Sequence, residues 1–301
     1  VAEVLKCDWE QCIIERGDSR KNLPWNIGQF GSNTSFTMSR SNYAAAMDLK
    51  QKLLSIAALA YGGEIKDYAI DGQRVYKKAS QSESMSYAEA AVRAIEIGGK
   101  FDGHIIPSDI NDMTRNSVDA IKGSGLIGVA KDNYPINGTP PALAAGFMMI
   151  ELDKETGKFE ILEYNGVIDC GTVIHPMGLA SQVKGGAVMG IGLAHLERLV
   201  YDPQNGLPAN IFLYESKPPT YLDVPSKLGS DAVDIPDPQN PVGVRGMGEP
   251  VMGCAAAALI SAISDALGGH YFNRTPISND MILNALHNQR QSHDPLQVYT
   301  F

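Results

Sequence analysis

The stretch that most restricts the fold is Gly243-Val244-Arg245-Gly246-Met247-Gly248-Glu249-Pro250, a glycine-rich loop that ends at a proline. An apolar, alanine-rich segment follows from Val251 to about Leu267, and Gly268-Gly269 predicts its end. Proline suits the first turn of a helix, where no N–H donor is needed, and it favours an extended conformation for the residue before it. The pattern therefore predicts a carboxylate, Glu249, at the entrance of a helix.

Two interpretations of Glu249 are open from the local pattern. It can be a helix-start carboxylate that the positive end of the helix dipole stabilises. It can also be a functional carboxylate that flexible glycine backbone holds in place. The neighbouring residues alone do not separate the two.

Composition and charge restrict the class of protein. The chain has 301 residues, 44% of them hydrophobic, and a net charge of −9. That length allows one large core or two ordinary ones, and we expect two subdomains, 1–141 and 142–301. The negative charge argues against nucleic acid or an anionic membrane surface as a partner. The longest apolar run, from Cys254 onward, is interrupted by Ser261, Ser264 and Asp265, so no membrane span is predicted.

Cysteine usage points to a reducing compartment. The four cysteines are few and scattered, and Cys7 and Cys12 lack the C-x-x-C spacing of a zinc or iron–sulfur site. Nothing in the sequence resembles a signal peptide. We therefore expect a cytoplasmic protein.

The first half contains a long polar stretch, residues 28–42, rich in hydroxyl side chains. Its length and composition predict a loop, either functional or simply flexible. A helix is expected from Tyr43 to Tyr61, behind Ser41 or Asn42 as N-cap, and another from Ser86 to about Ile97.

One glycine pattern, Gly123-Ser124-Gly125-Leu126-Ile127-Gly128, matches the dinucleotide-binding form G-x-G-x-x-G. That form requires a strand before it and a helix after it, so that a pyrophosphate meets the helix N-terminus. A polar segment precedes it here, and Pro135 follows soon after. A nicotinamide-dependent dehydrogenase is therefore the weakest of the functions considered.

The second half predicts a β-hairpin of strands 144–153 and 158–169. A helix is expected from Ala180 to Glu197, with four internal glycines that imply close packing against backbone or a ligand. Gln182 lies one turn before two of these glycines, where it either faces a polar ligand or is simply exposed. His175 and His195 are interpreted as structural. A strand is expected at Asp231–Ile235, and a last helix at Asn279–Asn288.

Four segments in this order resemble the molybdenum hydroxylases of the xanthine dehydrogenase and aldehyde oxidase type. They are Thr37-Met38-Ser39-Arg40-Ser41, Asp169-Cys170-Gly171 followed by His175-Pro176, the helix from Gln182 through Gly185-Gly186 to Glu197, and Gly246-Met247-Gly248-Glu249-Pro250. The resemblance covers almost the whole chain and implies an α+β fold, that of the C-terminal half of the molybdopterin-binding region. It suggests the medium molybdopterin subunit of a split enzyme such as nicotinate dehydrogenase.

The resemblance also implies a site. Glu249 resembles the active-site glutamate, and Thr37, Met38, Ser39, Arg40, Ser41, Gln182 and Gly248 resemble residues that bind the cofactor. Molybdenum would be held through the pterin dithiolene rather than by protein ligands, with Met38 and Glu249 nearby. Whether the pterin carries a nucleotide is left open. For Glu249 to act as a general base, we expect burial to raise its pKa above that of free glutamate.

The implied reaction is hydroxylation by water of an sp² carbon, in an N-heterocycle such as nicotinate or a purine, or in an aldehyde. A larger molybdopterin subunit, a 2Fe-2S subunit and an FAD subunit are the expected partners, because the chain has neither an iron–sulfur cysteine set nor an FAD motif. The alternative is a non-catalytic scaffold that completes a cofactor site, with Glu249 as a helix cap.

Overall fold

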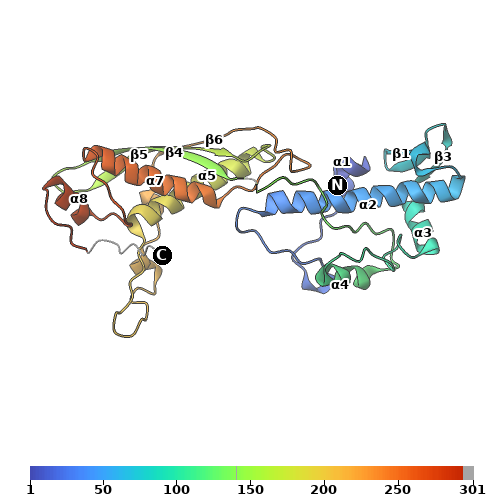
Figure 1. Ribbon diagram of the computed structural model, residues 1–301, viewed down its shortest axis with the longest axis horizontal. Helices are drawn as coiled ribbons and strands as arrows, with labels where there is room; N and C mark the ends of the chain where they lie inside the picture. Colours follow the sequence, from blue (N-terminus) through green and yellow to red (C-terminus); the bar gives the residue numbers. More distant parts are fainter. Residues whose placement is uncertain (140, 294–301) are drawn as a thin grey trace. The chain divides into compact units, whose positions relative to one another are not determined.

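The computed structural model describes residues 1–139 and 141–293, which form two compact units (Figure 1). Each unit draws on segments that are distant in sequence. Unit 1 contains 1–30, 34–137 and 239–241, and unit 2 contains 31–33, 138–238 and the chain from 242 onward. Residues 31–33 therefore belong to the unit that holds the glycine-rich loop 243–250.

Unit 1 is built on one long helix, α2 (Thr34–Tyr61). A three-stranded antiparallel sheet in the order β1-β2-β3 packs against it together with α1 and α3. The core includes Leu53, Ile56, Val75 and Met85. The elements of the unit are α1 (Ala2–Leu5), β1 (Tyr68–Asp71), β2 (Arg74–Lys77), β3 (Ser80–Ser86), α3 (Tyr87–Ile97), α4 (Asp112–Ile121) and the 3-10 turns Trp9–Gln11, Ser19–Lys21 and Ile65–Asp67.

Helix α2 begins earlier than the sequence predicts. Its first turns contain the hydroxyl-rich residues 34–41, which were expected to be a loop. The Ser39 hydroxyl donates to the Ser35 carbonyl oxygen (2.7 Å), and the Ser41 hydroxyl donates to that of Thr37 (3.1 Å). Serine side chains that bond one turn back are compatible with a helix, so hydroxyl content alone did not identify a loop. The expected helix from Ser86 is confirmed, with the Ser86–Glu89 capping box in place.

A buried lysine fixes the glycine-patterned segment to α2. Lys52, 6% exposed, donates to the Ile127 carbonyl oxygen (2.8 Å) and pairs with Asp48 (2.6 Å). A Cβ at Gly128 would lie 2.6 Å from the Ala45 carbonyl oxygen, so this glycine permits close packing. A helix precedes the pattern and irregular chain follows it, so the strand–turn–helix context of a dinucleotide site is absent.

Lys52→Met is expected to lower the free energy of unfolding by about 1–3 kcal/mol, because it removes the donor to two buried or half-buried acceptors. Urea denaturation of the purified protein measures the change. Lys131→Met, at an exposed lysine, is the matched control. A variant as stable as the parent would show that the Lys52 ammonium does not contribute to the packing of segment 127–129.

Unit 2 contains the predicted hairpin. Strands β4 (Leu143–Leu152) and β5 (Phe159–Asp169) pair antiparallel, with Leu143 opposite Asp169, which confirms the expectation. Strand β6 (Lys227–Ala232) pairs parallel to β5. A strand was expected at Asp231–Ile235, but β6 already ends at Ala232. Beyond β6 the Asp234 carboxylate accepts the Val173 N–H (2.8 Å), which links this segment to the chain that follows β5.

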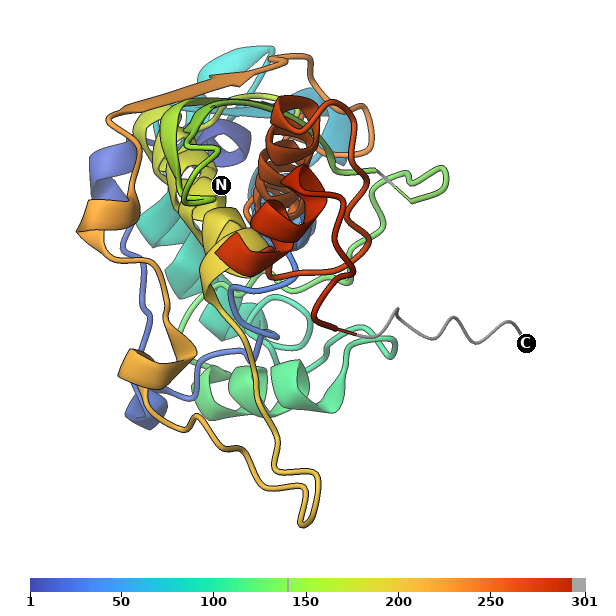
Figure 2. The same ribbon diagram turned by 90° about the vertical axis from the view of Figure 1, so that its left-hand side faces the viewer.

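Two helices of unit 2, α5 (Pro176–Ile191) and α7 (Glu249–Ala266), pack on each other, and α7 packs along the hairpin (Figures 1 and 2). A Cβ added at Gly186 would lie 2.9 Å from the Val251 Cβ, and one added at Gly190 would lie 2.5 Å from the Met252 carbonyl oxygen. Tight helix packing therefore explains these two glycines. The π-helical turn Gly192–Leu196, α6 (Leu213–Ser216), the 3-10 turn Tyr221–Asp223 and α8 (Asn279–Leu286) complete the unit.

Helix α7 is the only described helix that is long and apolar enough, by length and composition, to cross a bilayer. A single such helix is weak evidence, since core helices meet the same criterion. Its side chains Val251, Ala255, Leu259 and Ile263 are buried in the two clusters that form the core of unit 2.

Candidate functional site

A short antiparallel bridge places the glycine-rich loop beside the end of β5. The Arg245 N–H donates to the Cys170 carbonyl oxygen (2.7 Å), and the Thr172 N–H donates to that of Gly243 (2.8 Å). Gly171 has a φ of 66°, and a Cβ there would lie 2.1 Å from the Gly243 oxygen. The bridge thus joins residues 169–171 to the loop 243–250, although the two segments are far apart in the sequence.

Ion pairs of Arg245 hold the loop from two sides. Its Nε lies 2.6 Å from the carboxylate of Asp237, and its Nη1 pairs with Asp169 at the end of β5. The Asp237 side chain is 1% exposed. The hydrogen bond to Asp237 is the main cause that raises the pKa of the Arg245 guanidinium above its usual value. Arg245 therefore acts as an internal anchor of the loop.

The Glu249 side chain is held by residues 31 and 32, which also belong to unit 2. The Gly31 N–H donates to Oε1 (2.9 Å), and the Ser32 hydroxyl donates to Oε2. The Ser32 oxygen also accepts the backbone N–H of Glu249 (3.0 Å). Because Glu249 is the first residue of α7, Ser32 satisfies one of the free N–H groups at the start of that helix.

The expectation that burial raises the pKa of Glu249 is wrong for this structure. The side chain is exposed, and its pKa lies below the ordinary value of glutamate. The hydrogen bond from the Ser32 hydroxyl is the main cause, and backbone N–H donors add to it. Donors to the charged form outweigh the small desolvation of this carboxylate.

Glycines 246 and 248 let the Ser32 backbone and the Gln182 side chain come close to the loop that carries Glu249. A Cβ at Gly246 would overlap the Ser32 carbonyl oxygen, at 1.2 Å. A Cβ at Gly248 would lie 2.9 Å from Oε1 of Gln182, an exposed side chain on α5. The structure thus brings Gln182, Gly248 and Glu249 together within unit 2, and it adds Ser32, which sequence reasoning missed.

Residues Thr37 to Ser41 lie on α2 in unit 1, where a loop was expected. In a helix that begins at Thr34, N–H groups from Met38 onward bond within the helix, so the backbone N–H groups of Met38 to Ser41 are used by α2 itself. Thr37 is exposed, whereas Met38, Ser39 and Ser41 are half-buried. The Ser39 hydroxyl also accepts a hydrogen bond from the Asn240 amide (2.7 Å).

Arg40 is buried in unit 1 and already has protein partners. Its guanidinium pairs with Asp132 (2.6 Å), donates to the carbonyl oxygens of Tyr134 and Pro135 (2.6 and 3.3 Å), and lies over the Phe36 ring. These contacts tie α2 to segment 132–135. They give Arg40 a structural role, whereas the family resemblance implied that this residue binds the cofactor.

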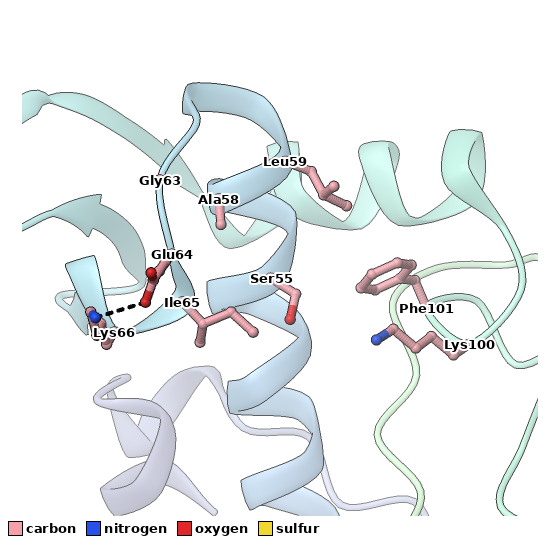
Figure 3. A pocket seen from close by; sticks show the side chains of 9 residues that line it. All are labelled: Ser55, Ala58, Leu59, Gly63, Glu64, Ile65, Lys66, Lys100 and Phe101. Carbon is pink, nitrogen blue, oxygen red and sulfur yellow. Dashed lines mark ion pairs between the residues drawn. The ribbon is translucent and has the colours of Figure 1, made fainter.

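Unit 1 also has an open groove of about 680 Å³ beside α2 (Figure 3). Leu59, Ile65 and Phe101 provide apolar lining, and two lysines stand at its edge. Lys66 pairs with Glu64 (2.8 Å), and the Lys100 ammonium lies 5.2 Å from the centre of the Phe101 ring. The groove contains none of the site residues predicted from the sequence.

The residues that the structure describes include no group of three His, Cys, Asp or Glu side chains that could hold a metal ion. His175 caps α5 by accepting the Gly178 N–H (2.7 Å), and His195 contacts the Ile277 carbonyl oxygen (2.6 Å). Both histidines thus make hydrogen bonds within the protein, as expected of structural residues.

The structure is an α+β fold with an exposed carboxylate at a glycine-lined helix start, and comparison with known proteins gives its family. The molybdopterin cofactor-binding domain family matches residues 1–225. Because the match covers most of the chain, the chain belongs to this family.

Individual relatives agree with this assignment. The 6-hydroxypseudooxynicotine dehydrogenase complex subunit gamma of Paenarthrobacter nicotinovorans is 27% identical over 94% of this chain and 33% of its own length. The carbon monoxide dehydrogenase large chain of Afipia carboxidovorans is 26% identical over 88% of this chain and 30% of its own.

Among solved structures, quinoline 2-oxidoreductase from Pseudomonas putida 86 aligns with a TM-score of 0.70 and 25% identity, over 96% of this chain and 34% of that one. The chain spans about a third of the length of the relatives it matches.

Proposed function

We propose that this chain forms part of the molybdopterin site of a hydroxylase and supplies its general base, Glu249. The observation that supports this role is the placement of the carboxylate. It is exposed at the start of α7, its two oxygens accept hydrogen bonds from Gly31 and Ser32, and glycines 246 and 248 flank it. An ionised, oriented and accessible carboxylate can accept a proton from water.

The residues around Glu249 fit a polar, heteroatom-rich cofactor. The exposed Gln182 side chain lies beside Gly248, in the loop that leads to Glu249, and offers both an amide donor and an acceptor there. On unit 1, Thr37, Met38, Ser39 and Ser41 are the other proposed binding residues, whereas the Arg40 guanidinium is already engaged by Asp132 and by carbonyl oxygens. When bound, the molybdenum cofactor supplies the two-electron redox chemistry.

In this proposal Glu249 takes the proton of the water whose oxygen enters the product. The substrate carbon is sp² and electron-poor. Named relatives include a nicotine 6-hydroxylase large subunit as well as the quinoline enzyme. We therefore propose an N-heteroaromatic compound as substrate, with purines and aldehydes as the other classes to test. Fe-S and FAD subunits are the proposed partners that carry the electrons away, since relatives such as the subunit gamma belong to dehydrogenase complexes.

The intact enzyme purified from its source tests this function. We expect about one molybdenum per copy of this chain by elemental analysis, and reduction of an artificial dye acceptor with at least one of quinoline, nicotinate, hypoxanthine and benzaldehyde. The label of H₂¹⁸O is expected in the product, because water is the oxygen donor. An enzyme without molybdenum, or one that incorporates oxygen from O₂, would contradict the proposal.

A further inference from the structure

The Ser32 hydroxyl makes two hydrogen bonds with the same residue, Glu249, one as acceptor and one as donor. A backbone N–H can only donate, so the contact from Glu249 N (3.0 Å) requires the Ser32 oxygen to accept. The one hydrogen of that hydroxyl is then available for the Glu249 carboxylate, to which it donates. The direction of the hydrogen bond is thus fixed by the start of α7 itself.

The carboxylate receives one donor on each oxygen. Ser32 donates to Oε2, and the Gly31 N–H donates to Oε1 at 2.9 Å. Two donors on different oxygens set the plane of a carboxylate, whereas a single donor leaves it free to rotate. This geometry holds the side chain in one orientation although it is exposed.

The close approach of residues 31–33 depends on Gly246. Any larger residue there would place a Cβ 1.2 Å from the Ser32 carbonyl oxygen, which is backbone and cannot move aside as a side chain can. At Gly248 a Cβ would lie 3.4 Å from the Ser32 hydroxyl oxygen. The loop before α7 is therefore shaped to receive Ser32 as well as to present Glu249.

From these contacts we infer that Ser32 is a positioning residue for the Glu249 base, because its hydroxyl helps to hold the carboxylate in one orientation. This inference rests on the proposed function, because it assigns Ser32 a role in that reaction. Ser32 acts through Glu249 and needs no contact with substrate.

Charged groups on the neighbouring elements do not replace this hydrogen bond. Arg245, on the same loop, is engaged with Asp169 and Asp237. Lys184 on α5 is exposed, and His175 uses its Nδ1 to cap α5. Hydrogen bonds to Glu249 itself, with that of Ser32 first, are the causes that lower its pKa. Without the Ser32 hydroxyl the carboxyl group should protonate at a higher pH.

The test compares Ser32→Ala and Ser32→Thr in the intact enzyme, with Ser261→Ala, an exposed serine of α7, as control. We expect Ser32→Ala to lower kcat/KM about tenfold at the parent's optimum, the loss expected for one hydrogen bond to a charged group. The acid limb of its pH profile should move to higher pH. Ser32→Thr keeps the hydroxyl but places a β-branched side chain at a φ of 47°, so it should restore the parent's profile only in part. Ser261→Ala should retain the profile in full.

A second readout does not depend on turnover. The infrared carboxyl band of Glu249, isolated as the difference between each enzyme and its Glu249→Gln counterpart, gives the titration midpoint directly. We expect this midpoint to rise in Ser32→Ala. If that variant does not fold, Ser32→Cys keeps a side chain of similar size with a weaker donor and should show a smaller rise.

An unchanged profile and an unchanged midpoint in a folded Ser32→Ala enzyme would overturn the positioning role. That result is distinct from a failure of the proposed function. If Glu249→Gln is fully active, the base assignment itself fails whatever Ser32 does. If Glu249→Gln is inactive while Ser32→Ala matches the parent, only the role of Ser32 is lost.

Discussion

Glu249→Gln is expected to reduce kcat by a factor of at least about 100, the lower end of what a positioned general base contributes. Glutamine has nearly the same shape and keeps an oxygen that can accept the Ser32 or Gly31 hydrogen bond, but it cannot take up a proton at neutral pH. The molybdenum content and the melting temperature should therefore stay close to those of the parent enzyme.

The measurement is steady-state turnover of the intact enzyme together with elemental analysis of the same sample. Glu155→Gln, in the exposed turn of the β4–β5 hairpin, is the matched control and should be fully active. Full activity of Glu249→Gln would favour the scaffold alternative, in which the carboxylate only supports the start of α7. The low pKa and the Ser32 contact would suit that role as well, so turnover decides between them.

Arg245→Met should have the largest effect on stability, a loss of about 3–5 kcal/mol in the free energy of unfolding, as found when one partner of a buried ion pair is removed. The change leaves the Asp237 carboxylate, 1% exposed, without its cation, and it also removes the partner of Asp169. Because the same loop leads to Glu249, activity should fall together with stability.

Chemical denaturation of the purified protein measures this loss, and Arg198→Met, at an exposed arginine of unit 2, provides the comparison. Arg245→Lys should recover part of the stability, because it restores the charge but lacks the planar pair of donors that reaches two carboxylates. Equal stability of Arg245→Met and Arg198→Met would mean that the ion pairs do not hold the loop.

Elements with strong local patterns could be predicted from the sequence. The β4–β5 hairpin follows from its alternating residues, and α7 follows from Pro250 and the apolar segment behind it. The sheet of unit 1 was not predicted, since β3 (Ser80–Ser86) is almost entirely polar and only Met85 is buried in it. Its strands are short, and their position depends on packing against α2 rather than on their own composition.

The candidate site was predictable only in part, for a similar reason. Glu249, Gly248 and Gln182 lie in segments whose local patterns stand out, and the structure places them together. Ser32 lies in a stretch that was noted only for its hydroxyl content. Its partner is 217 residues away, and no periodicity or spacing in the sequence indicates such a pair. Likewise, the helical state of residues 34–41 depends on hydrogen bonds that composition does not reveal.

The separation between Ser32 and Glu249 also sets the order of events during synthesis. Contacts between residues far apart in the chain form late, because the intervening chain must first be brought together. Residues 31–33 leave the ribosome long before loop 243–250 exists, so they stay without their partner until unit 2 is nearly complete. The Glu249 carboxylate consequently receives its two donors only after both segments have been synthesised and have come together.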